Sequence, residues 1–99
     1  MSPADLEQLK RLARLHPLAP AVEEYAGQLH LVDDQGRTLL GDGEVPLRYA
    51  TAAACRAALL SSIQREALRA RRAAAEAEAL ATARESAVRR AVALVGGLP

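Results

Sequence analysis

The sequence predicts an α+β fold in which an N-terminal helix and a small antiparallel β-hairpin or three-stranded meander precede a long Ala-rich C-terminal helix. Residues 50–95 contain no glycine or proline, and 18 of them are alanine, the strongest helix former. Residues 28–49 instead hold short apolar segments separated by turn residues. At 99 residues, the chain has the size of a single small domain.

The first expected element is a helix over residues 1–16. Ser2 is a capping residue, Pro3 suits the first helical position, and Asp5 suits the positive end of the helix dipole. Pro17 disfavours helical geometry at the residue before it, so the helix is expected to stop at about His16.

Residues 17–27 are expected to form a linker or turn that is stiffened by Pro17 and Pro20. Two conformations remain open after Pro20. Either it begins a single helical turn that ends at Gly27, or it begins an extended segment that leads into the next strand.

Residues 28–49 are expected to form the hairpin. The first strand is 28–32, the turn is Asp33-Asp34-Gln35-Gly36, and residues 37–40 return. A second turn at 41–43 precedes a third strand over 44–49, which Pro46 confines to a sheet edge or a bulge.

The long helical segment is expected over residues 50–95, with Thr51 as its cap and 96–99 as a tail. It is either one helix or a helical hairpin whose two halves meet near residues 73–82.

One face of this segment carries a continuous apolar stripe at mostly heptad spacing, within about 80° of arc. Alanines fill its middle and larger side chains its two ends, which favours an antiparallel pair of helices in close contact. We expect a homodimer whose interface comprises Leu59, Ile63, Ala67, Ala70, Ala74, Ala77, Ala81, Val88 and Val92, with Val95 continuing the stripe.

Other sides of the same segment carry most of the basic charge. Residues 50–95 hold eight arginines and four glutamates, whereas the remainder holds five basic and eight acidic side chains. The candidate partner-binding face comprises Arg65, Arg69, Arg71, Arg72 and Arg90. Arginines on successive helical turns are also able to contact phosphates, so a nucleic-acid-binding protein is the alternative.

No catalytic, cofactor-binding or metal-binding residues are expected. His16, His30 and Cys55 are not at metal-ligand spacing, and we expect Cys55 to be a small buried hydrophobe. The acidic residues fall mainly in turns, and no phosphate-binding glycine loop is present. We therefore expect a non-enzymatic protein.

The single cysteine excludes an internal disulfide and fits a cytoplasmic location. The start of the chain lacks the features of a signal peptide, and the sequence holds no run of about 18 apolar residues, so no membrane association is expected.

The layout of a strand ending at Tyr49, a cap at Thr51 and an alanine-rich helix resembles small bacterial and phage modules. The overall character is similar to accessory proteins of phages and mobile elements, many of which act by occupying a host protein's surface. The resemblance assigns no role to particular residues. It implies a small adaptor or inhibitor with a protein partner.

Overall fold

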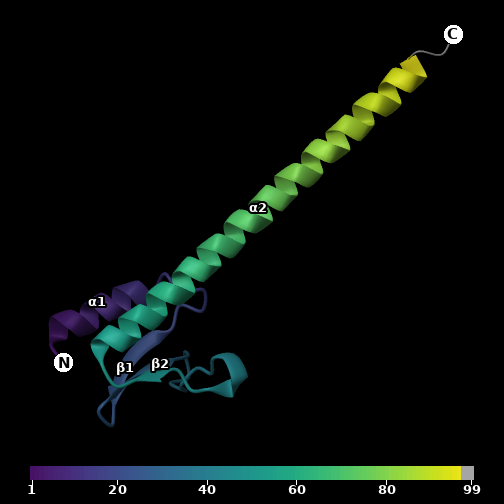
Figure 1. The fold of residues 1–99 in the computed structure, drawn as a ribbon. Coiled ribbons are helices and arrows are strands. Elements are labelled where there is room, and N and C mark those ends of the chain that lie inside the picture. The colour runs from purple at the N-terminus through teal and green to yellow at the C-terminus, as the bar shows by residue number, and fades with distance from the viewer. Residues whose placement is uncertain (97–99) are drawn as a thin grey trace. The chain divides into compact units, whose positions relative to one another are not determined.

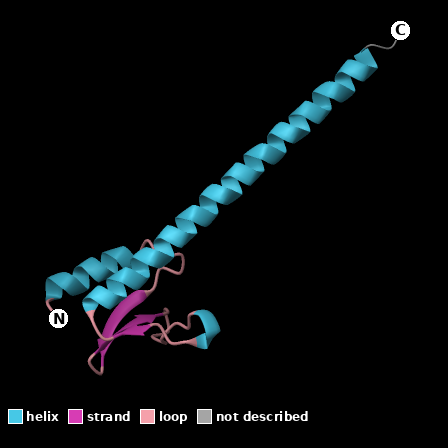
Figure 2. Ribbon diagram, viewed as in Figure 1, coloured by secondary structure: helices cyan, strands magenta, loops and turns pink. Residues whose placement is uncertain are grey.

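The computed structural model describes residues 1–96 and confirms the α+β fold. The elements follow in the order α1 (Pro3–Ala13), β1 (Ala21–Tyr25), β2 (Gln28–Val32), a short 3-10 turn η1 (Asp42–Glu44), β3 (Arg48–Tyr49) and α2 (Ala52–Gly96) (Figures 1 and 2). The chain divides into two units, Met1–Glu66 and Ala67–Pro99, and each is described by itself. Three residues of the expected tail, 97–99, lie outside the described residues.

Helix α1 spans Pro3–Ala13 and begins as expected from its capping residues. The Ser2 hydroxyl accepts a hydrogen bond from the Asp5 N–H at 3.1 Å, and Pro3 occupies the first turn, where its missing N–H costs nothing. The helix ends three residues before the expected His16, and Arg14 is its C-cap. Leu9 and Ala13 are its buried residues.

The segment expected to be a linker contains strand β1 (Ala21–Tyr25), so the helical-turn alternative is wrong. The segment is extended, as the other alternative held, but it forms a strand of its own and is not the start of the strand over 28–32. β1 pairs antiparallel with β2 (Gln28–Val32), and Val22 lies opposite Leu31 in the register. The hairpin therefore begins before residue 28. Burial of Val22 between its neighbours outweighs the weak local signals for a strand.

Ala26 and Gly27 form the two-residue connection of this hairpin. Their φ angles are +51° and +75°, and two successive positive φ values are the requirement of a type I′ turn. Such turns match the right-handed twist of the flanking strands, which explains the tight connection. Glycine adopts this conformation freely, whereas Ala26 does so at a cost of about 1–2 kcal/mol.

The expected turn over residues 33–36 is present. The Asp33 carboxylate accepts hydrogen bonds from the backbone N–H groups of Gln35 and Arg37, both at 2.9 Å. The return segment 37–40, however, is not a regular strand: it makes isolated bridges, Val32 to Thr38 and Leu40 to Pro46.

The third strand is shorter than expected. β3 comprises only Arg48–Tyr49, which pair antiparallel with His30 and Leu29, so the sheet order is β1-β2-β3. Pro46 has no N–H to donate to a neighbouring strand. It lies outside β3 and takes part in an isolated bridge with Leu40, which agrees with the expectation that this proline occurs only at a sheet edge or a bulge.

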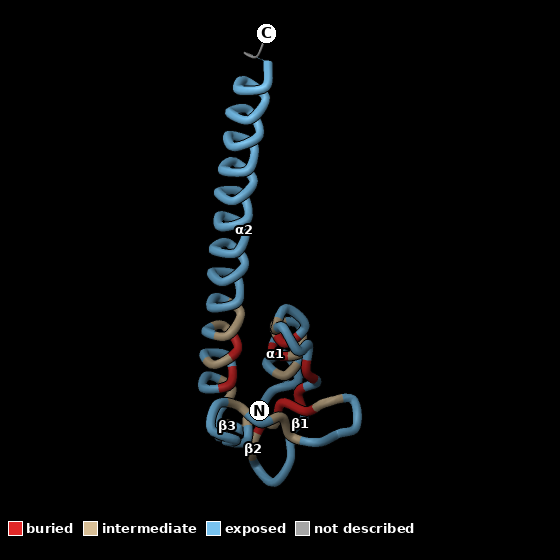
Figure 3. Tube along the Cα trace, turned by 90° about the vertical axis from the view of Figure 1, so that its right-hand side faces the viewer, coloured by how far each residue is buried: buried red, intermediate tan, exposed pale blue. Residues whose placement is uncertain are grey.

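The core of the first unit lies between the sheet and two helical segments. Figure 3 shows the buried residues gathered in α1, the strands and the first turns of α2. Val22, Leu29 and Leu31 lie on one face of the sheet, as the alternation of a strand requires. The core cluster comprises Leu9, Ala13, Val22, Leu29, Leu31, Cys55 and Leu59.

Helix α2 spans Ala52–Gly96 as one helix, so the segment is not a helical hairpin. Thr51 caps it as expected, because its hydroxyl accepts a hydrogen bond from the Ala54 N–H at 3.1 Å. Its buried residues are Cys55 and Leu59, both in its first two turns. Every described residue from 64 onward is exposed.

We predict that Ala26→Asn stabilises the fold by about 0.5–1 kcal/mol, because asparagine tolerates the left-handed conformation better than alanine. Ala26→Val is the matched control and should be destabilising, because a β-branched side chain is strained at positive φ. Urea unfolding followed by circular dichroism measures both. A lower midpoint for Ala26→Asn than for the parent chain would contradict the assignment of this turn.

Candidate binding surfaces

The apolar stripe expected from the sequence divides between the chain's own core and its exposed surface. Leu59 is completely buried in the core of the first unit, so it is not available to a partner in this structure. Ile63 is half-buried. The other seven residues of the expected interface belong to the second unit and are exposed: Ala67, Ala70, Ala74, Ala77, Ala81, Val88 and Val92.

The large side chains of the stripe in the second unit are uncovered. Val88, Val92 and Val95 expose 61%, 64% and 70% of their surface, respectively. An isolated apolar residue on a surface is ordinary, but these three are spaced four and three apart and therefore lie on one side of the helix. They form an apolar surface that no described residue of the chain covers.

The local chemistry of the second unit supports a stable helix. Glu85 precedes Arg89 by four residues, which is the favoured order for such a pair, and the Arg89 Nη2 to Glu85 Oε1 distance is 2.8 Å. Both side chains are mostly exposed, so this pair contributes only a few tenths of a kcal/mol. The alanines supply the remaining preference for helix.

The arginines of the candidate partner-binding face are all exposed, but they do not form one cluster. Arg65 belongs to the first unit and donates a hydrogen bond to the Ser62 hydroxyl at 3.4 Å. In the second unit, Arg69 and Arg72 lie on neighbouring turns of one face, with Arg90 further along the same side. Arg71 lies on a different side of the helix.

Cys55 and the histidines occupy structural positions. Cys55 is completely buried, and burial raises the pKa of its thiol to about 11. The His16 Nδ1 accepts a hydrogen bond from the Leu18 N–H at 3.1 Å, and burial lowers the pKa of this imidazole. The His30 Nδ1 lies 3.0 Å from the Thr38 hydroxyl. Among residues 1–96, no group of His, Cys, Asp and Glu is arranged to hold a metal ion.

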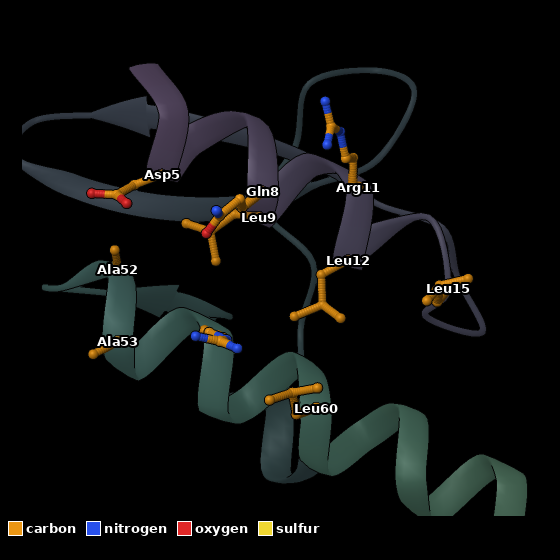
Figure 4. A pocket seen from close by; sticks show the side chains of 10 residues that line it. Asp5, Gln8, Leu9, Arg11, Leu12, Leu15, Ala52, Ala53 and Leu60 are labelled. Carbon is orange, nitrogen blue, oxygen red and sulfur yellow. The ribbon is translucent and has the colours of Figure 1, made fainter. Parts of the chain in front are cut away.

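The sequence analysis missed a groove that the structure forms between α1 and the first turns of α2. Its volume is about 640 Å³, and its lining residues all belong to the first unit. Figure 4 shows Leu9 and Leu12 directed from α1 toward α2, with Ala53 and Leu60 on the facing helix. The spacing of leucines in 9–15 was visible in the sequence, but the separation of the two helices was not.

Comparisons with known proteins identify no relative: no family model, no curated protein and no solved structure matches the chain. Within residues 1–96, no helix combines the length and the hydropathy needed to cross a lipid bilayer. The function must therefore be argued from the surfaces themselves.

We predict that Cys55 reacts slowly with a thiol reagent such as dithionitrobenzoate while the chain is folded. Its burial restricts access, and a pKa of about 11 keeps the thiol protonated at neutral pH. The same thiol should react at the rate of a free cysteine in concentrated guanidinium chloride. Rapid, complete labelling of the folded chain at pH 7 would show that Cys55 is accessible and would contradict this assignment.

Proposed function

We propose that the protein is a non-enzymatic binding protein, a small adaptor or inhibitor that acts in the cytoplasm by occupying the surface of another protein. We further propose that it is a homodimer whose subunits associate through the α2 stripe. The observation that carries this proposal is the uncovered apolar face of the second unit, with three valines each exposed by more than 60%.

The size of the uncovered face supports an interaction rather than chance exposure. Complete burial of one valine side chain contributes about 1.5–3 kcal/mol, so covering Val88, Val92 and Val95 offers several kcal/mol to an association. The surrounding alanines add little area each. They do permit two helix axes to approach to about 8 Å, which increases the number of van der Waals contacts.

An antiparallel pair of helices is the arrangement that suits this sequence best. If the pair is centred between Ala77 and Glu78, Ala74 lies opposite Ala81 of the second copy, and Ala67 lies opposite Val88. Ala70 lies opposite Glu85 in this register, whereas Ala67, Ala74 and Ala81 face small or medium-sized side chains, which fills the space between the helices at those positions without steric overlap. A parallel pair would place alanine against alanine throughout the middle and the valines together at one end.

A nucleic-acid-binding protein is the second candidate, and the exposed Arg69 and Arg72 on one helix face favour it. Neighbouring Glu76 and Glu78 reduce the positive potential of this region. Binding of this kind should weaken steeply with salt, because each phosphate contact releases counterions. If a mobility-shift assay with duplex DNA shows no complex even at low salt, this candidate is excluded.

We predict that Val88→Asp with Val92→Asp converts a dimer into a monomer, because two carboxylates would be desolvated in the interface. Light scattering coupled to size-exclusion chromatography measures the change, from about twice the chain mass of 10.5 kDa to that mass. Leu80→Asp with Leu94→Asp is the matched control. These residues are similarly exposed, at 52% and 75%, but lie off the stripe, so the dimer should persist.

A monomeric parent chain at all concentrations would contradict the homodimer. The stripe would then remain the proposed surface for a different protein. A photo-crosslinking side chain at position 92 in the producing cells distinguishes these cases. A product of about twice the chain mass identifies a second copy, another mass identifies a different protein, and no product would contradict the binding function itself.

A further inference from the structure

A row of three charged residues borders the α2 stripe along one side. Arg71, Glu78 and Glu85 are spaced seven residues apart, so they lie on the same side of the helix. Arg71 directly follows Ala70, and Glu78 directly follows Ala77, so the row lies beside the stripe. All three residues are exposed and belong to the second unit. This border row is therefore placed to meet the charges of a helix that covers the stripe.

The two ends of the border row keep their capacity to bind an opposite charge. Among residues 1–96, Arg71 makes no ion pair or hydrogen bond with another residue. Glu85 pairs with Arg89 within the helix, but this pair uses one carboxylate oxygen, Oε1. The Glu85 side chain remains 65% exposed. A second basic group is therefore able to approach its carboxylate.

The order of charges along the border row is complementary to itself when a second copy runs in the opposite direction. The row is positive at its N-terminal end, Arg71, and negative at its C-terminal end, Glu85. A register centred between Ala77 and Glu78 places Arg71 level with residue 84 of the second copy, about 1.5 Å along the axis from Glu85. Because a two-fold axis relates the copies, the same contact occurs twice.

Other arrangements of two copies do not bring these charges together. In a parallel pair in register, each residue lies level with its own counterpart, and Arg71 is about 21 Å along the axis from Glu85. The antiparallel pair has one unfavourable feature, since Glu78 meets its own counterpart at the centre. The two Arg71–Glu85 contacts at the ends oppose that repulsion and are the charge contacts that favour this orientation.

The border row also discriminates between a second copy and a different helix. Arg69, Arg72 and Arg90 lie away from the stripe, so most of the positive charge of the second unit does not face a helix on the stripe. A uniformly acidic helix would be attracted at Arg71 and repelled at Glu85, and a uniformly basic helix would be repelled at Arg71. A helix with both charges in the reverse order suits the row, and an antiparallel second copy supplies that order.

We propose that Arg71 of each copy pairs with Glu85 of the other, and that these two contacts set the antiparallel orientation and the register of the homodimer. This inference rests on the proposed function for the existence of the homodimer. It adds the residues that specify how the two copies pair. The apolar stripe supplies the attraction, and the border row selects one geometry among those that the stripe permits.

The test reverses each charge in the full chain and measures the dimer dissociation constant by analytical ultracentrifugation at low ionic strength. Arg71→Glu alone and Glu85→Arg alone each place like charges at both contacts, so each should weaken the dimer by at least about fivefold. Mixing the two variants restores opposite charges at both contacts. The mixture should therefore form a heterodimer with an affinity within about twofold of the parent.

Arg72→Glu and Glu76→Arg are the matched controls. They make the same two changes in charge on the side of the helix away from the stripe. Each control alone should keep the parental dissociation constant within about twofold, and their mixture should show no preference for a heterodimer. Circular dichroism of every variant measures helix content, which separates loss of pairing from loss of the helix itself.

Glu78→Gln provides a second, conservative test of the orientation. We predict that it tightens the dimer by about twofold or more, because it removes two carboxylates that face each other at the centre of an antiparallel pair. The same ultracentrifugation measurement detects the change. An unchanged or weaker dimer would contradict the antiparallel register.

The failure of this inference is distinguishable from the failure of the proposed homodimer. A dimeric parent whose affinity is unaffected by Arg71→Glu and Glu85→Arg would overturn the pairing while leaving the stripe as the interface. Weak dimers that mixing does not restore would also overturn it, because the two residues would then act separately. A monomeric parent chain would overturn both the homodimer and the pairing that depends on it.

Discussion

Burial of Leu29 and Leu31 on the central strand is the interaction on which the rest of the structure depends. Both side chains are almost completely buried, and they share one core with Leu9 from α1 and with Cys55 and Leu59 from α2. Two leucines at alternate positions of β2 need cover on only one face of the sheet, and the two helices supply it. The burial of these few aliphatic side chains is the main source of stability, because the chain has no Phe or Trp to add larger areas.

This small core limits how much of α2 is used for folding. Only its first turns supply buried residues, and all described residues from 64 onward are exposed. The remainder of the helix is favoured by alanine propensity and by pairs such as Glu85–Arg89, not by tertiary packing. A long helix with an uncovered apolar side is well suited to association, which is why the proposed function is placed on the second unit. The groove in the first unit has a related origin, because α1 and α2 both pack on the sheet and leave Leu12 and Leu60 between them only partly buried.

The sequence predicted those features whose causes are local. Ser2 and Thr51 marked both helix starts, and the absence of glycine and proline over 50–95 predicted the long helix. Strand β1 was assigned to a linker because its turn, Ala26-Gly27, lacks the asparagine or aspartate that normally precedes glycine in such a turn.

The positions of the surfaces were harder to predict, because they depend on tertiary structure. Leu59 has the same periodicity as the exposed stripe residues, and only the position of the sheet makes it a core residue. The groove likewise depends on how far α1 and α2 lie apart, which no sequence spacing specifies.

Hydrogen exchange measured by mass spectrometry on the full chain, at low and high protein concentration, tests most directly whether the second unit lacks an intrachain partner. The account predicts strong protection of the amides of Leu29, Leu31 and Leu59 at both concentrations, because they open only with the core. It predicts weak protection over residues 67–96 at low concentration and stronger protection as the dimer forms. Protection of 67–96 that equals the core and does not change with concentration would contradict it, because a contact within one chain would then be stabilising the second unit.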